Sequence, residues 1–259
     1  MKIRVLGSGT SDGVPSIGCH CPVCRSDDAK DRRSRSSVLV SHGGGNLLID
    51  ATTDLRWQSL AWGIERLDAV LFTHAHADHV SGIDEIRSFN KLQRKQIPAF
   101  GDSRTVQDIK RKFYYLFEQG KTGGGKADIR LEPVTGPFEV CGIPVRPLEI
   151  MHGQTPIYGY RIFDFAYLSD CSAIPEATYA QLHNLDVLIL DALKKRPHST
   201  HFSLDEAIEA AERIKAKRTF FTHICHEISH REDGKLLPEG MAFAYDGLLI
   251  STGFSGEAL

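Results

Sequence analysis

Residues 70–79 read Val-Leu-Phe-Thr-His-Ala-His-Ala-Asp-His. The first four residues are apolar or β-prone and predict a buried strand that stops abruptly. Four side chains of metal-binding type follow it, namely His74, His76, Asp78 and His79. Residues two apart in an extended chain point the same way, so His74 and His76 can reach one ion together. Asp78 and His79 lie where the chain would turn into a helix and can face a second ion. Neutral imidazoles and a carboxylate suit zinc, iron or manganese, so this stretch predicts a metal site.

Three later apolar runs each end in a further candidate ligand. They are Val145–Met151 before His152, Phe165–Ser169 before Asp170, and Arg218–Thr222 before His223. Pro147 predicts that the first of these strands lies at an edge or is irregular. This pattern is expected where strands of packed sheets deliver ligands to one shared edge.

This order of ligands, with its strand context, resembles the metallo-β-lactamase superfamily over nearly the whole chain. The resemblance implies an α/β fold, a four-layer αββα sandwich, with residues 1–259 as a single domain. It assigns one ion to His74, His76 and His152, and a second ion to Asp78, His79 and His223. Asp170 would bridge the two ions, and Asp78 is counted as catalytic as well as a ligand. Asp50 would support the ligand loop from behind.

Two divalent ions held in this way predict hydrolysis by a metal-activated water. Such a pair lowers the pKa of a shared water from 15.7 towards about 7 and clamps the attacked group. A protein nucleophile is then unnecessary. The ligand types accept zinc or manganese, with iron as a further alternative.

A second metal site is predicted near the N-terminus. Cys19, Cys21 and Cys24 could clamp one tetrahedral zinc, and the residues alone leave Cys225 and His226 open as the fourth ligand. The cysteine spacing resembles that of the PhnP family of cyclic phosphodiesterases, and this resemblance implies His226. The site would be a structural zinc that fixes an irregular loop.

Resemblance also identifies a candidate proton donor. In the phosphodiesterase branch and in tRNase Z, a histidine just before a late helix assists at the leaving group or phosphate. His201 holds that position here, because a capping box at Ser203–Glu206 marks the start of the late helix. Histidines titrate near neutral pH, which suits general acid catalysis. Together with the thiol cluster, His201 favours a small cyclic or nucleotide-like phosphodiester as substrate. The alternatives are an ester, lactone or thioester hydrolase of the same fold, or a non-catalytic binding protein similar to PqqB.

The composition of the chain limits the kinds of molecule that the protein is expected to bind. The chain is 41 % hydrophobic and 25 % charged with a net charge of −2, which is ordinary globular composition and argues against a strongly electrostatic grip on nucleic acid. No apolar run approaches the roughly 20 residues that span a bilayer, and the N-terminus does not read as a signal peptide. We therefore expect a cytoplasmic enzyme with a small-molecule substrate and no membrane partner. Relatives are often dimers, so a homodimer is an expectation as well.

Other segments carry weaker predictions. Residues 7–13 are glycine-rich but miss the dinucleotide fingerprint, so they predict a loop near the metal site. Helical spacing covers 83–96 and 105–118, and residues 119–127 predict a plain loop or a mobile lid. The 105–127 region is longer than in the phosphodiesterases that the chain resembles, and it falls where substrate would be selected. Cys141 and Cys171 read as small buried hydrophobes. The remaining histidines, at positions 20, 42, 183 and 230, read as surface or structural.

Overall fold

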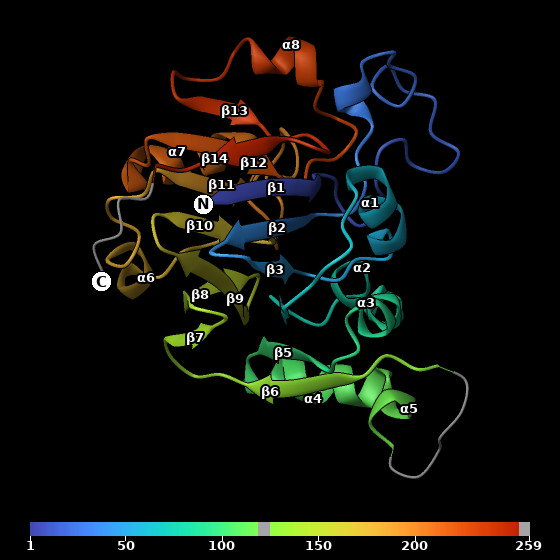
Figure 1. Cartoon of the computed structure of the whole chain (residues 1–259). Coiled ribbons are helices and arrows are strands. Elements are labelled where there is room, and N and C mark those ends of the chain that lie inside the picture. Colours follow the sequence, from blue (N-terminus) through green and yellow to red (C-terminus); the bar gives the residue numbers. More distant parts are fainter. Residues whose placement is uncertain (119–124, 254–259) are drawn as a thin grey trace.

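Two sheets face each other in the computed structural model, which describes residues 1–118 and 125–253 (Figure 1). In spatial order the first sheet holds β14 (Leu249–Ser251), β1 (Lys2–Gly7), β2 (Ser37–His42), β3 (Gly45–Ile49), β4 (Ala69–Leu71), β5 (Ile97–Gly101) and β6 (Ile129–Pro133). The second holds β13 (Met241–Phe243), β12 (Arg218–Thr222), β11 (Val187–Asp191), β10 (Phe165–Leu168), β9 (Thr155–Ile162), β8 (Ile143–His152) and β7 (Phe138–Val140). Both sheets mix parallel and antiparallel pairs.

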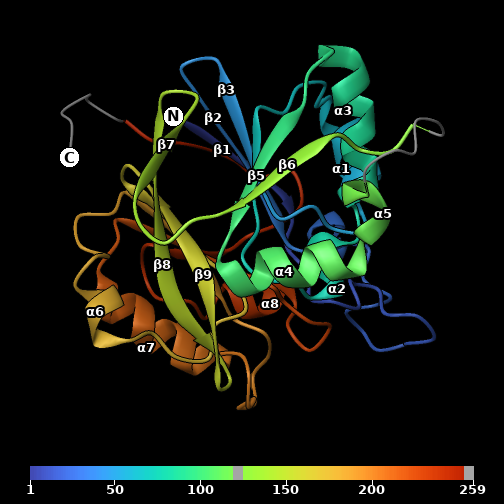
Figure 2. The same cartoon turned by 90° about the horizontal axis from the view of Figure 1, so that it is seen from below.

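Helices cover the outer face of each sheet, which gives the αββα order (Figure 2). The helices of the first half are α1 (Leu55–Trp62), α2 (Ala77–Val80), α3 (Ile86–Gln93), α4 (Ser103–Lys112) and α5 (Tyr114–Phe117). Those of the second half are α6 (Glu176–Tyr179), α7 (Leu204–Ile214) and α8 (His230–Gly234). Short 3₁₀ turns lie at Ala29–Asp31 and Ile83–Glu85. The predicted α/β sandwich is confirmed.

Alternation along the strands explains the three apolar cores. In β10, Phe165 and Tyr167 pack between the sheets, while Ala166 and Leu168 face the layer of α7. Successive strand residues point to opposite faces, so a strand covered on both faces is apolar throughout. The third core lies between the first sheet and α1, α3 and α4.

Local sequence signals fix several element ends. Ser203 caps α7 by accepting from the Glu206 backbone N–H, and the Glu206 carboxylate accepts from the Ser203 N–H in return, so the predicted capping box is present. The β2–β3 hairpin turns at Gly43 and Gly44, both with positive φ. Pro147 lies beyond the short β7, which pairs only with 143–145 of β8. The outer side of β8 is therefore an edge at Pro147, as predicted.

Two predicted helices are shorter than their periodicity suggested. The first is a 3₁₀ turn followed by α3, which ends at Gln93 because Arg94 adopts φ 53°. The second breaks at Phe113, with φ −113° and ψ 39°, into α4 and α5. Residues 119–124 lie outside the described residues, so the predicted lid is untested. Within the described ranges, no helix has the length and apolar character needed to cross a bilayer.

Candidate metal centre

The histidine-rich stretch leaves β4 and turns directly into α2, as its sequence predicts. His76 is the residue before α2, and Asp78 and His79 lie in its first turn. Asp50, directly after β3, holds this loop from behind. Its carboxylate accepts from the Thr73 N–H (2.9 Å) and hydroxyl (2.8 Å), and it lies 2.7 Å from His79 Nδ1. The supporting role predicted for Asp50 matches these contacts.

One cluster of candidate ligands contains His74, His76 and His152. His74 Nε2 lies 2.9 Å from His76 Nδ1, and the His74 and His152 rings are 5.4 Å apart. His152 Nδ1 faces two carbonyl oxygens, those of Asp170 at 3.1 Å and Thr200 at 2.9 Å. Carbonyls only accept, so Nδ1 carries the proton and Nε2 keeps its lone pair for an ion.

The second cluster contains Asp78, His79, Asp170 and His223. His79 Nε2 lies 3.3 Å from Asp78 Oδ2 and 3.2 Å from Asp170 Oδ2. His223 Nε2 lies 3.7 Å from Asp78 Oδ2 and 3.4 Å from Asp170 Oδ1. Asp170 also approaches the first cluster, with Oδ1 4.0 Å from His74 Nε2. The structure thus brings together all seven predicted ligands, with Asp170 between the two groups.

The donor atoms of the second cluster fit a cation. His79 Nε2 and His223 Nε2 are buried and have no hydrogen-bond partner among the described residues. Buried polar atoms are normally satisfied, and these two are aimed at carboxylate oxygens. The Asp50 carboxylate accepts a hydrogen bond from the Nδ1–H of His79, which leaves the Nε2 lone pair facing Asp78 and Asp170. Imidazole and carboxylate donors that converge in this way suit zinc, manganese or iron.

Charge in the centre favours a cation as well. Burial would lower the pKa of His223, but the carboxylates of Asp170 and Asp78 outweigh it and raise that pKa to about 9. Burial opposes ionisation of Asp170, yet the imidazoles of His223 and His79 hold the pKa of its carboxyl well below the usual range. At His74, burial dominates and lowers the pKa of the imidazole. The carboxylates therefore make a negative site in which a metal ion can replace bound protons.

Backbone strain accompanies the residues that end the strands. Asp50, Asp170 and His223 have φ of 64°, 58° and 58°. Residues other than glycine seldom adopt such values, and they cluster at functional sites held in place by their surroundings. The left-handed conformation ends each strand and turns the chain at the point where the side chain enters the centre.

His201 lies at the same centre. Its ring stacks on that of His223, with 4.8 Å between centroids and 8° between planes, and its Nε2 is 4.0 Å from Asp170 Oδ1. Its Nδ1 lies 3.1 Å from Asp191 Oδ2, which also accepts from the backbone N–H groups of Cys171 and Phe202. His198 is exposed, so the structure places His201, not His198, at the centre.

Sequence reasoning missed the role of Asp191. It is the last residue of β11 and is fully buried. The available signal was its position directly after the apolar run 187–190, because the predicted metal ligands also follow apolar runs.

The predicted thiol cluster is also assembled. His226 Nδ1 lies 3.2 Å from Cys19 Sγ and 3.4 Å from Cys21 Sγ, and Cys24 completes the group. Cys225 lies apart from this group, and its sulfur accepts from the Glu227 N–H. Burial raises the pKa of Cys21, but hydrogen bonds from the Cys24 backbone and His226 lower it to about 6, which favours a thiolate ligand. The geometry selects His226 as the fourth candidate ligand.

Smaller predictions have mixed outcomes. Cys171 is fully buried as expected, but the prediction for Cys141 is wrong, because it lies exposed in the β7–β8 turn with φ 55°. The glycine-rich loop runs beside the centre, since the Thr10 N–H donates to the carbonyl of Ile224, directly after His223.

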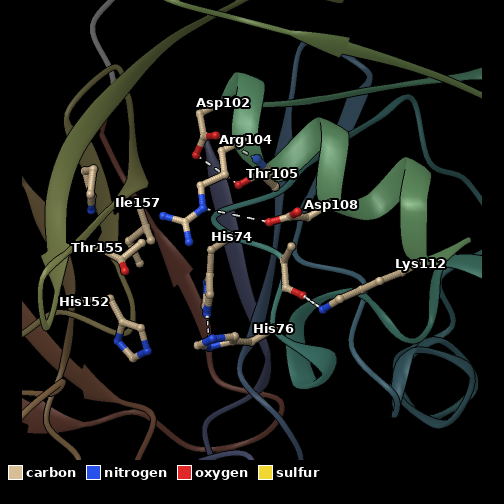
Figure 3. A pocket seen from close by; sticks show the side chains of 12 residues that line it. His74, His76, Asp102, Arg104, Thr105, Asp108, Lys112, His152, Thr155 and Ile157 are labelled. Atoms are coloured by element: carbon tan, nitrogen blue, oxygen red, sulfur yellow. Dashed lines mark hydrogen bonds and ion pairs between the residues drawn. The ribbon is translucent and has the colours of Figure 1, made fainter.

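A cavity opens beside the first cluster and was not predicted from sequence. Its volume is about 120 Å³, and Figure 3 shows His74, His76 and His152 beneath a wall formed by α4. Arg104, Asp108 and Lys112 project from that helix towards the cavity.

Comparison with known proteins identifies the class. Residues 45–224 match the family model described as the beta-lactamase superfamily domain, and the chain belongs to this superfamily. Its fold is that of the metallo-β-lactamase hydrolases.

The individual proteins that the chain is similar to carry different names. A crystal structure described as a new diphosphatase from the PhnP family is 42 % identical, with a TM-score of 0.91 and 97 % of each chain covered. Coenzyme PQQ synthesis protein B of Methylobacterium radiotolerans is 36 % identical over 97 % of this chain and 100 % of its own length. An octanoyltransferase of Porphyromonas gingivalis is 36 % identical over 96 % of this chain, which spans only 51 % of that protein. Zn²⁺-bound PqqB of Methylobacterium extorquens, 21 % identical with a TM-score of 0.79, shares the fold.

Proposed function

We propose that the protein is a dinuclear metal-dependent phosphodiesterase that acts on a small cyclic or nucleotide-like phosphodiester. The observation that carries the proposal is the pair of ligand clusters that meet at Asp170. His74, His76 and His152 would hold one ion, Asp78, His79 and His223 the other, and Asp170 would contact both. Bound there, two divalent ions would lower the pKa of a water towards about 7 and neutralise charge on the attacked phosphoryl group.

The chain's own residues supply the remaining chemistry. Asp50 and the carbonyls of Asp170 and Thr200 fix the ring orientation of His79 and His152. Asp191 orients His201 so that Nε2 faces the centre, where it can give a proton to the departing oxygen. The cysteine cluster with His226 would hold a structural zinc that anchors residues 19–24 to the segment after His223.

Three features support a phosphodiester over other substrates: the assembled thiol cluster, the position of His201, and the similarity to a PhnP-family diphosphatase. The rival functions are hydrolysis of an ester, lactone or thioester, and non-catalytic binding as suggested by similarity to a PQQ synthesis protein. Retention of all seven candidate ligands favours catalysis.

Hydrolysis of bis(p-nitrophenyl) phosphate, its monoester and a thiol ester by manganese- or zinc-loaded protein tests the proposal. We expect turnover of the diester, with two ions per chain bound at the centre. Asp170→Ala should reduce turnover by more than the roughly 10–100-fold typical of outer-sphere changes, and lower the metal content. Asp205→Ala, an exposed carboxylate on α7, is the matched control. Near wild-type activity of Asp170→Ala would refute the dinuclear assignment, and turnover of the thiol ester alone would favour the rival hydrolase.

A further inference from the structure

The cavity beside the first ligand cluster has two walls of different character. One wall is the face of α4 that carries Arg104, Asp108 and Lys112, spaced four residues apart and therefore aligned along the helix. The other comes from the start of β9, with Thr155, Pro156 and Ile157. The buried side of α4 packs into the core through Val106 and Ile109, which fixes which face meets the cavity.

Within the described part of the chain, the two cations on this wall have few ion-pair partners. Among the described residues, Asp108 Oδ2 is the sole carboxylate oxygen within 4.0 Å of the Arg104 guanidinium, at 3.9 Å from Nε. Asp108 is engaged more closely by Arg111, at 3.0 Å. Lys112 donates to the carbonyl of Ala75, a neutral acceptor between His74 and His76. Asp102 also lines the cavity, but its carboxylate caps α4 through the Thr105 N–H (2.8 Å) and hydroxyl (3.0 Å).

We propose that Arg104 and Lys112 form a binding subsite for a second phosphoryl group of the substrate, next to the phosphodiester that reacts at the metal centre. This inference rests on the proposed function and makes it more specific. The preferred substrates would then be those whose scissile phosphate is linked to a second anionic phosphate, such as a diphosphate diester.

Chemistry and space agree with this assignment. A guanidinium offers paired N–H donors that match phosphate oxygens, and an ammonium adds a point charge. The cavity volume of about 120 Å³ leaves room for a phosphate group. The histidines that line the cavity are those of the first cluster, so a group bound there lies beside the reacting phosphate (Figure 3). The apolar surface of Pro156 and Ile157 would face the uncharged part of the substrate.

The test compares two substrates across matched variants of metal-loaded protein. The substrates are a nucleoside diphosphate sugar, which carries a second phosphate, and bis(p-nitrophenyl) phosphate, which does not. Arg104→Gln and Lys112→Met should each lower kcat/KM for the first substrate roughly 10–100-fold, mainly through KM, and change the second less than about threefold. Lys110→Met removes the same charge from α4 outside the cavity and should leave both substrates unchanged.

Inorganic pyrophosphate gives an independent reading, as an inhibitor of bis(p-nitrophenyl) phosphate hydrolysis. We expect competitive inhibition that is weakened in Arg104→Gln and Lys112→Met but not in Lys110→Met. Equal losses on both substrates, or unchanged inhibition by pyrophosphate, would overturn the subsite while leaving the phosphodiesterase proposal standing. Absence of diester hydrolysis by the unaltered protein would instead refute the proposed function itself.

Discussion

His201 shows how one buried carboxylate can fix the chemistry of a loop histidine. Asp191 Oδ2 accepts three hydrogen bonds, from His201 Nδ1 and from the backbone N–H groups of Cys171 and Phe202. The two backbone contacts hold the carboxylate in place, so it presents one orientation to the imidazole. With its Nδ1 proton directed to Asp191, His201 turns Nε2 towards Asp170.

His201→Ala should therefore slow substrates according to how much their leaving group needs a proton. For a diester with an alkyl leaving group we expect a loss in kcat of about 10²–10⁴-fold, the usual contribution of general acid catalysis. Nitrophenyl diesters should lose less than about tenfold, because nitrophenolate departs without protonation. Parallel kinetics of His183→Ala, an exposed histidine remote from the centre, provide the control. Equal losses for both leaving groups would assign His201 to phosphate binding instead.

At this scale the sequence was informative where ligand-type residues directly followed apolar runs. The histidines and aspartates at positions 74–79, 152, 170 and 223 could be predicted because solvated turns seldom gather so many ligands behind buried strands. Asp191 has the same context, but a single carboxylate at the end of a strand does not indicate that it binds His201. Arg104 and Lys112 could not be predicted, because charges on one helix face are also what an ordinary solvated surface requires.

Among the elements, the segment from Pro15 to Asp28 depends most on side-chain ligands. It contains no helix or strand and relies on turns and the thiol cluster for its shape. The fourth candidate ligand, His226, lies three residues after His223. A zinc bound by the cluster would therefore hold this irregular loop against the segment that carries His223, a candidate ligand of the metal centre.

Cys21→Ser should lower the melting temperature and remove about one zinc per chain. Hydrolysis of bis(p-nitrophenyl) phosphate should persist at temperatures where the variant stays folded, since no atom of Cys21 belongs to the centre. Metal analysis and thermal unfolding of Cys141→Ser, whose thiol is exposed and outside the cluster, should match the unaltered protein. An unchanged zinc content in Cys21→Ser would rule out the structural site.

Element boundaries were harder to predict than element types. Periodicity alone does not show that Phe113 leaves helical geometry, because its apolar side chain fits the pattern on either side. Capping chemistry is more local and was predictable, as the Ser203–Glu206 box shows.

For the whole molecule, the centre joins the two sheets. His74, His76, Asp78 and His79 follow β4 of the first sheet, whereas His152, Asp170 and His223 follow or end strands of the second. Ions bound by both sets would link the sheets near one edge of the interface, and any ligand that binds only the folded state stabilises it.

Removing the metals with a chelator should therefore lower the melting temperature of the whole protein. Binding at about 100 times Kd contributes about 2.7 kcal/mol, and 1 kcal/mol shifts a chain of this size by roughly 2–4 °C, so a fall of roughly 5–10 °C is expected. Calorimetry with and without chelator measures the shift, and restoring zinc or manganese should reverse it. Asp170→Ala should respond less to the chelator; a shift as large as that of the unaltered protein would place the stabilising ion elsewhere.

The wide separation of these ligands along the chain also sets an order of events during synthesis. His79 leaves the ribosome roughly 140 residues before His223. At a synthesis rate of about 5–20 residues per second, roughly 7–30 s pass between the synthesis of the histidine-rich loop and that of His223. A nascent chain can hold at most an incomplete centre during that interval. Ions that need all seven candidate ligands could therefore bind only after β12 has emerged and joined its sheet.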